Sequence, residues 1–260
     1  MLHIVIKTEC YKLKRYNILW AGVALMLLSV LLTLFTSIAN DGSVWDFAYL
    51  TEQVIKNNMT MIFPMCITLI AGYIISREQT QDTLKNILTV PVSFKWLLTG
   101  KLIVCGGLFI IFGLICSFFT IVAEFLIGFP GFGVPLAIKA VVQITAVNFL
   151  LYLAVLPIIV FTSQLTSGFL VGVILAFVYG YGGLFAARNM TLANLYPITA
   201  SLGIVDYRSY DEAVHWNILM CICSLILVVG ISVMLIFGIK GQELKQINKK
   251  SKKVVIKKGW

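Results

Sequence analysis

The chain has 260 residues, a length that suits one large soluble domain or two small ones. Its composition excludes both, because 60% of the residues are hydrophobic and 12% are charged, against about 45–50% and about 25% in soluble proteins. The formal net charge of +9 would favour a nucleic-acid partner in a soluble protein, but Lys and Arg also gather in the cytoplasmic loops of membrane proteins. The sequence is therefore that of a membrane protein.

Six segments are apolar enough to be membrane helices, since about 20 such residues cross about 30 Å of hydrocarbon. In chain order they are 18–37, 59–75, 102–122, 140–161, 168–185 and 218–239. The second and the fifth are short for a crossing helix. We therefore predict an all-α, polytopic membrane protein with six transmembrane helices, organised as one domain over residues 1–260.

The distribution of basic residues predicts the orientation of these helices. With the N-terminus inside, the cytoplasmic pieces hold 16 Lys and Arg residues and the external pieces hold four. This asymmetry follows the positive-inside rule, so we predict that both termini are cytoplasmic. The external pieces are then 38–58, 123–139 and 186–217. The same rule explains the net charge without a nucleic-acid partner.

Residues 1–17 are predicted to form an amphipathic helix that lies in the membrane plane. Leu2, Ile6, Cys10 and Leu13 recur at helical spacing, and basic side chains occupy the other side. A basic helix with one apolar face is typically buried at the level of the lipid headgroups. A solvated tail is the alternative, but it would leave the apolar stripe exposed to water.

The cytoplasmic piece between the second and third spans, residues 77–101, is not composed like a loop. Its first half carries an apolar helical face, which is made by Thr83, Leu84, Ile87 and Leu88. Pro91 then disfavours helix at Val90, and a second short apolar helix from Phe94 continues into the third span. This apolar face needs a cover, which is the protein's own bundle, the headgroup zone or a second polypeptide.

Two segments near the C-terminus also differ from simple loops. The external stretch 187–217 contains an uncharged and mostly apolar part that is too short to cross the membrane. Such a length is typical of a re-entrant or interfacial segment, and Tyr196-Pro197 would divide it into two short helices. The tail 240–260 has eight lysines and one glutamate, so we expect a solvated tail that touches anionic membrane lipid.

Few residues in this sequence suit catalysis or metal binding. The two histidines, His3 and His215, fall on opposite sides of the predicted membrane and cannot share a metal. Thr99-Gly100-Lys101 is similar to the end of a phosphate-binding loop, but the first glycine and the final Ser or Thr are missing. We predict no catalytic, cofactor-binding or metal-binding residue in this chain. No predicted span holds a charge near its centre, although proton- or sodium-coupled carriers usually show one, so energy for the work of this protein would come from elsewhere.

The fourth predicted span carries three uncharged polar residues, Gln143, Thr145 and Asn148. Two interpretations of them are open. Such side chains commonly hydrogen-bond between membrane helices, a contribution of about 0.6–2 kcal/mol each. The other interpretation is a place on a substrate path.

A family resemblance rests on two cytoplasmic stretches. The N-terminal helix contains Glu9 followed by Lys12-Leu13-Lys14-Arg15. The segment after the second span reads E-x4-T-L-K-x-I-L-x-x-P-V-S, formed by Glu78, Thr83-Leu84-Lys85, Ile87-Leu88 and Pro91-Val92-Ser93, and ends on Leu97-Leu98-Thr99-Gly100-Lys101. Both stretches resemble the permease subunits of ABC-2 type transporters, and among them the lantibiotic (bacteriocin) immunity and bacitracin-resistance-like branch. One departure is Asp82, where the family commonly has Gly.

The resemblance implies that the helix around Leu84 is a coupling helix, seated in a groove on a separate ATPase subunit. Its ATPase-coupling residues would be Glu78, Thr83, Leu84, Lys85, Ile87, Leu88 and Pro91. The ATPase would bind ATP and Mg, so this chain holds no cofactor and is not an enzyme by itself. A second permease subunit, identical or related, would complete the transporter.

The function implied by the resemblance is ATP-driven export of an antimicrobial peptide, or a similar amphipathic compound, from a bacterial cell membrane. Such export would serve self-protection or resistance. The alternative is an ATP-independent immunity or binding protein that sequesters a toxin or a lipid. That alternative leaves the apolar face in residues 77–101 without an explanation.

Overall fold

The computed structural model describes residues 2–38, 45–80, 94–165 and 168–238. All regular structure within these ranges is helical. The elements are α1 (Leu2–Leu13), α2 (Ile18–Ser37), α3 (Phe47–Asn57), the π-helical turn η1 (Asn58–Ile62), α4 (Phe63–Thr80), α6 (Phe94–Ile127), α7 (Val134–Thr162), α8 (Gly168–Ala186), α9 (Met190–Leu195), α10 (Pro197–Ile204) and α11 (Ile218–Gly238). The prediction of an all-α protein is confirmed for the described residues.

Five helical segments are long and apolar enough to cross a membrane. They are Ile18–Ser37, Phe47–Arg77, Lys95–Ile127, Val134–Thr162 and Ile218–Gly238. The helix predicted at 168–185 is present as α8, but its apolar part, Leu170–Ala186, is shorter than these five. The chain is thus a multi-pass membrane protein, while the count of six crossings stays a prediction.

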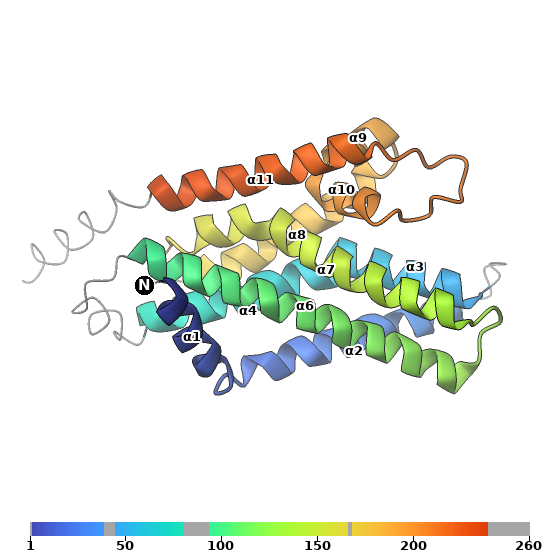
Figure 1. Cartoon of the computed structure of the whole chain (residues 1–260), viewed down its shortest axis with the longest axis horizontal. Helices are drawn as coiled ribbons and strands as arrows, with labels where there is room; N and C mark the ends of the chain where they lie inside the picture. Colours follow the sequence, from blue (N-terminus) through green and yellow to red (C-terminus); the bar gives the residue numbers. More distant parts are fainter. Residues whose placement is uncertain (1, 39–44, 81–93, 166–167, 239–260) are drawn as a thin grey trace, which may run out of the picture.

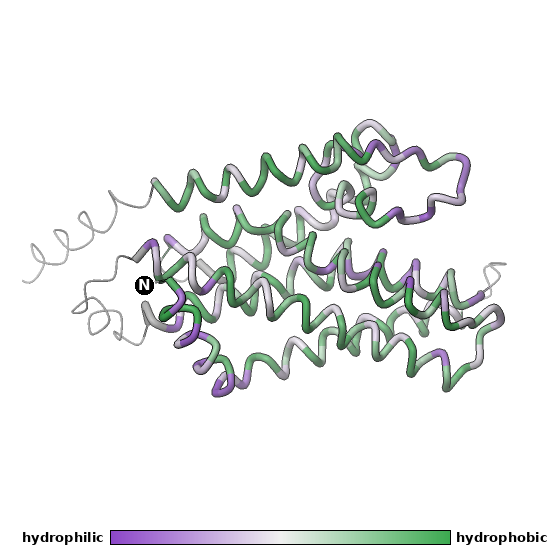
Figure 2. Tube along the Cα trace, in the orientation of Figure 1, coloured by the Kyte–Doolittle hydropathy of each residue, from purple (hydrophilic) through white to green (hydrophobic). Residues whose placement is uncertain are grey.

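The long helices lie side by side in one bundle (Figure 1), with apolar residues along most of their length (Figure 2). Helix α6 packs along α7, α4 packs along α8, and α11 packs against α7. Phe63, Phe109 and Phe112 are almost fully buried between the helices. Trp20 and Leu126 are among many large apolar side chains that are exposed. Such an outer surface is suited to contact with lipid tails.

The piece predicted to be external at 38–58 contains a helix that begins at Phe47 and continues through η1 into α4, and its external location stays a prediction. The Asp46 carboxylate caps this helix by accepting a hydrogen bond from the Tyr49 N–H at 2.7 Å. The residues that suggested a loop were polar, but they alternate at helical spacing with Leu50 and Val54, which are fully buried. The second span is therefore longer than predicted and begins nearer the N-terminus.

The third and fourth predicted spans are the central parts of α6 and α7, and both helices extend into the predicted loops. The connection between them is short because Gly128 and Gly131 adopt positive φ angles of 75° and 85°. These angles are accessible to glycine without steric cost. The external piece predicted at 123–139 is thus mostly helical.

The segment predicted to be broken at Tyr196-Pro197 consists of two short helices, as expected. Helix α9 ends at Leu195 and α10 begins at Pro197, whose fixed φ suits the first helical turn. Helix α10 packs against α7, α8 and α11, and Ile198 and Ala200 are fully buried. Helix α10 is therefore packed inside the protein, whereas Leu192 and Leu195 of α9 are exposed.

Helix α1 runs across the end of the bundle, crosswise to the long helices, and the C-terminal end of α11 lies at this same end (Figure 1). The predicted N-terminal helix is confirmed, but one residue of its apolar face is assigned wrongly. Cys10 is exposed, whereas Glu9 is only 3% exposed and faces the bundle. The side of α1 that faces the bundle is therefore the one that carries Glu9, and the buried partner of Glu9 explains this orientation.

Candidate functional site

The candidate site lies at the end of the bundle that carries α1, where α4 ends at Thr80 and α6 begins at Phe94. The predicted second short apolar helix is confirmed as the first turns of α6. Glu78 belongs to the last turn of α4, and its side chain lies outside the described part of the structure. The other predicted coupling residues, which are Thr83, Leu84, Lys85, Ile87, Leu88 and Pro91, lie outside the described residues. Their role stays a prediction.

The helices on either side of this segment are tied to α1 by a buried ion pair. The Lys101 ammonium on α6 lies 2.7 Å from the Glu9 carboxylate on α1, and the two side chains are 2% and 3% exposed. Lys101 also donates to the Ile74 carbonyl on α4 at 3.4 Å. The other Glu9 oxygen accepts a hydrogen bond from Lys12 at 2.7 Å. One lysine thus links α1, α4 and α6.

Close packing reinforces this link. A Cβ atom at Gly100 would lie 2.6 Å from Val5 Cγ1 on α1, so any larger residue there would force the Val5 side chain to move. The Arg77 guanidinium lies 4.7 Å from the centre of the Tyr16 ring, and this cation–π contact joins the end of α4 to the turn after α1. Any displacement of the first turns of α6 would therefore act on α1 and on α4.

The three polar residues of α7 have different neighbours, and their place on a substrate path stays a prediction. Thr145 faces α6, where a Cβ atom at Gly113 would come within 2.8 Å of the Thr145 Cα. The side-chain oxygen of Asn148 accepts a hydrogen bond from the side-chain nitrogen of Asn58 on η1 at 3.4 Å. The Gln143 amide donates to the Val205 carbonyl at 2.9 Å. Each residue contacts a different neighbour, which is the arrangement expected of a helix interface.

A polar cluster in the centre of the bundle was not predicted from the sequence. The Asn58 oxygen accepts a hydrogen bond from the Ser29 hydroxyl at 2.6 Å, and its nitrogen contacts Cys116 Sγ at 3.3 Å. Asn58 was assigned to an external loop, and nothing in the sequence near it indicated burial. With Asn148, this cluster joins α2, η1, α6 and α7. Hydrogen bonds of this kind stabilise contacts between membrane helices.

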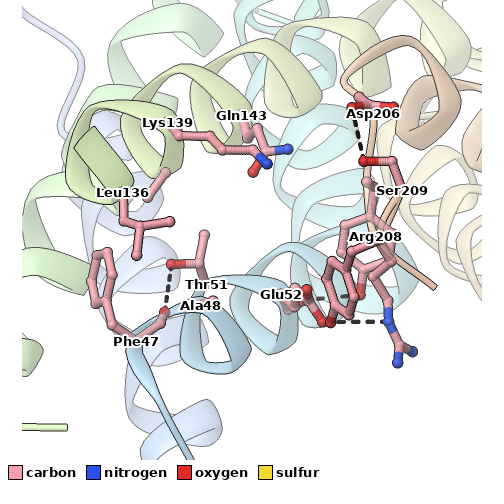
Figure 3. Close-up of a pocket in the computed structure, with 13 residues that line it drawn as sticks. Phe47, Ala48, Thr51, Glu52, Leu136, Lys139, Gln143, Asp206, Arg208 and Ser209 are labelled. Carbon is pink, nitrogen blue, oxygen red and sulfur yellow. Dashed lines mark hydrogen bonds and ion pairs between the residues drawn. The ribbon is translucent and has the colours of Figure 1, made fainter. Parts of the chain in front are cut away.

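A cavity of about 140 Å³ opens at the opposite end of the bundle, between α3, α7 and the loop after α10 (Figure 3). Glu52 and Arg208 form an ion pair across it, with 3.4 Å between Oε2 and Nε. Partial burial and a hydrogen bond with the Glu52 carboxylate raise the pKa of the Tyr210 phenol. Lys139 and Gln143 line the cavity from α7. Apart from Gln143, the sequence did not indicate these residues as functional.

Comparison with known families matches residues 5–183 to the model of the ABC-2 family transporter proteins. The matched range begins in α1, includes the predicted coupling segment and ends in α8. The chain belongs to the ABC-2 transporter family. A comparison with curated proteins finds no match.

As an ABC-2 family protein, this chain is the membrane component of an ABC transporter, and membership implies partnership with an ABC ATPase. The family match confirms the resemblance to ABC-2 permeases that the two stretches around Glu9 and Leu84 indicated. Within the described ranges, no group of three or more His, Cys, Asp or Glu side chains is arranged to hold a metal ion.

Proposed function

We propose that this ABC-2 protein is the permease subunit of an exporter that removes antimicrobial peptides, or similar amphipathic compounds, from the membrane. In this proposal an ATPase partner receives the segment around Leu84, a second permease subunit completes the transporter, and both termini are cytoplasmic. The family match over residues 5–183 is the observation that carries the proposal.

The contacts around α1 support the role of the segment between α4 and α6. Force applied to this segment would reach α6 at Lys101 and α4 at Ile74, which share one buried ammonium. Because α1 is bound to the same ammonium through Glu9, it would move with the two spanning helices. The ion pair therefore gives the first turns of α6 a direct mechanical connection to the bundle.

The spans support an amphipathic cargo and an external source of energy. The central parts of the predicted spans hold no Asp, Glu, Lys or Arg, although carriers coupled to protons or sodium usually require such a group. Large apolar side chains such as Phe35 and Phe118 are exposed along the helices. A compound with an apolar face could leave the lipid along such a surface without losing its apolar contacts.

The experiment that tests ATPase coupling compares Leu84→Asp with Asn86→Asp. In the predicted helix Leu84 lies on the apolar face and Asn86 on the opposite side, so both variants add the same charge but only the first removes an apolar contact. We expect Leu84→Asp to remain in the membrane, to lose the ATPase in a pull-down and to stop export. Asn86→Asp should behave as the wild type. Retention of the ATPase by Leu84→Asp would contradict the proposed contact.

The cargo is tested by deleting the gene and measuring growth inhibition by lantibiotics, bacitracin and unrelated drugs in parallel. Increased susceptibility to amphipathic peptides alone is expected. If deletion of the gene leaves growth inhibition by every compound unchanged, export of an antimicrobial compound is refuted. Protection that survives inactivation of the ATPase would instead favour a protein that sequesters its target.

A further inference from the structure

The cavity lined by α3, α7 and the loop after α10 holds charges of both signs that are not equally compensated. Arg208 has two acidic neighbours, because Glu52 lies 3.4 Å and Asp211 lies 3.5 Å from its guanidinium. Lys139 makes no ion pair with any residue that the structure describes, and neither does Asp206. The cavity therefore offers one ammonium and one carboxylate without an ion-pair partner within 4 Å among the described residues, and the Lys139 charge acts on Glu52 only at longer range.

These two charges lie on different elements of the cavity wall. Lys139 projects from α7 beside Gln143, and Asp206 belongs to the loop, where it accepts a hydrogen bond from the Ser209 hydroxyl at 2.8 Å (Figure 3). The Gln143 nitrogen is engaged by the Val205 carbonyl, which leaves its oxygen as an acceptor. The α7 side of the wall thus presents the Lys139 ammonium and the Gln143 oxygen, and the loop side presents the Asp206 carboxylate.

The loop that carries Asp206 is held in an unusual conformation. Asp206 and Arg208 have φ angles of 57° and 52°, although neither is glycine. Such angles persist where the surrounding structure enforces them, and they cluster at functional sites. The Tyr207 hydroxyl donates to the Glu52 carbonyl at 3.2 Å, and the Trp216 indole donates to the Tyr207 carbonyl at 2.7 Å. The charged side of the cavity is therefore fixed before any ligand binds.

The surroundings of the cavity are those of a membrane surface. It lies at the ends of spanning helices, and Leu136 on its rim is 39% exposed. Val134 and Ile138, on the same turns of α7, are 69% and 61% exposed. A polar ligand bound here would have apolar side chains next to it, as the headgroup of a lipid does.

We propose that this cavity binds a headgroup that carries both a phosphate and a primary ammonium, as in phosphatidylethanolamine, with the phosphate at Lys139 and the ammonium at Asp206. An anion alone would face the Asp206 carboxylate, and a cation alone would face Lys139, so a zwitterion suits the site better than either. A primary ammonium donates hydrogen bonds to carboxylates, which a quaternary ammonium cannot do. Binding at this site requires no ATPase and does not rest on the proposed export activity.

The test measures lipids retained by the purified full-length protein, by native mass spectrometry after incubation with equal amounts of phosphatidylethanolamine, phosphatidylglycerol and phosphatidylcholine of matched chains. Phosphatidylethanolamine should be retained preferentially. Loss of one charge-assisted hydrogen bond corresponds to about a tenfold weaker affinity or more, so Lys139→Met and Asp206→Asn should each reduce retention by that factor. Lys56→Met, an exposed residue of α3 outside the cavity, is the matched control and should retain the lipid fully.

Soluble competitors distinguish recognition of the headgroup from contacts with the lipid chains. Phosphoethanolamine should displace the lipid, and inorganic phosphate should not. Equal retention of the three lipids by the wild type, wild-type retention of phosphatidylethanolamine by both variants, or failure of phosphoethanolamine to compete would each overturn the proposal. Lys139 is exposed, so Lys139→Met keeps the test decisive even if the Asp206 variant does not fold.

Discussion

The buried ion pair between Glu9 and Lys101 allows a stability prediction whose magnitude follows from its geometry. Glu9→Leu removes the carboxylate 2.7 Å from an ammonium that is only 2% exposed. Removing one partner of a buried ion pair typically costs about 3–5 kcal/mol, because the remaining charge has lost both water and its counter-ion. We expect Glu9→Leu to lower the free energy of unfolding by that amount.

Two related variants give a graded expectation. Lys101→Met should cost less, about 1–3 kcal/mol, because Glu9 keeps its contact with Lys12 at 2.7 Å. Lys12→Met removes a pair whose lysine is 32% exposed, and such partly hydrated pairs contribute less than about 1 kcal/mol. The double variant Glu9→Leu/Lys101→Met should recover part of the loss, since apolar replacement of both partners leaves no unpaired charge from this pair.

The free energies are measured by equilibrium unfolding of the purified protein in mixed micelles, with circular dichroism as the signal. Hydrogen exchange of the α1 amides shows whether the loss is local, because α1 is a terminal helix and can detach before the bundle unfolds. A free energy of unfolding of Glu9→Leu within 1 kcal/mol of the wild-type value would refute the reasoning. So would effects of the two single variants that simply add, because contacting partners of a buried pair must couple.

Three further predictions concern other contacts. Gly113→Ala should destabilise the protein by about 1–3 kcal/mol, since the new Cβ would lie 2.8 Å from the Thr145 Cα. Gly107→Ala is the control and should not destabilise it, because Gly107 has open space around it. The two variants are compared by thermal unfolding in detergent. Asn58→Leu removes the partner of the buried Ser29 hydroxyl and should cost about 1–3 kcal/mol in the same assay. Burial raises the pKa of Tyr196 to about 12, so stability contributed by its protonated hydroxyl should fall as pH rises from about 10 to about 12, and Tyr196→Phe should abolish that part of the pH dependence.

Local sequence patterns determined which segments are helical and where several of them end. The first span was predicted at 18–37 and α2 occupies Ile18–Ser37, because a continuous apolar run can satisfy its backbone in lipid only as a helix. Tyr196-Pro197 predicted the break between α9 and α10, since proline cannot continue a helix that precedes it. The two stretches predicted to be cytoplasmic also sufficed to indicate the family, and the family match over residues 5–183 includes both of them.

The tertiary structure decided which polar residues are buried and with what they pair. Glu9 and Lys101 are 92 residues apart, and no periodicity connects them; their burial follows from the packing of α1 on α6. The helix from Phe47 was missed for a related reason, because polar residues resemble a loop until α2 and α7 are known to cover the apolar side. Hydropathy averages over neighbours in the chain, whereas the energy of a buried charge depends on neighbours in space.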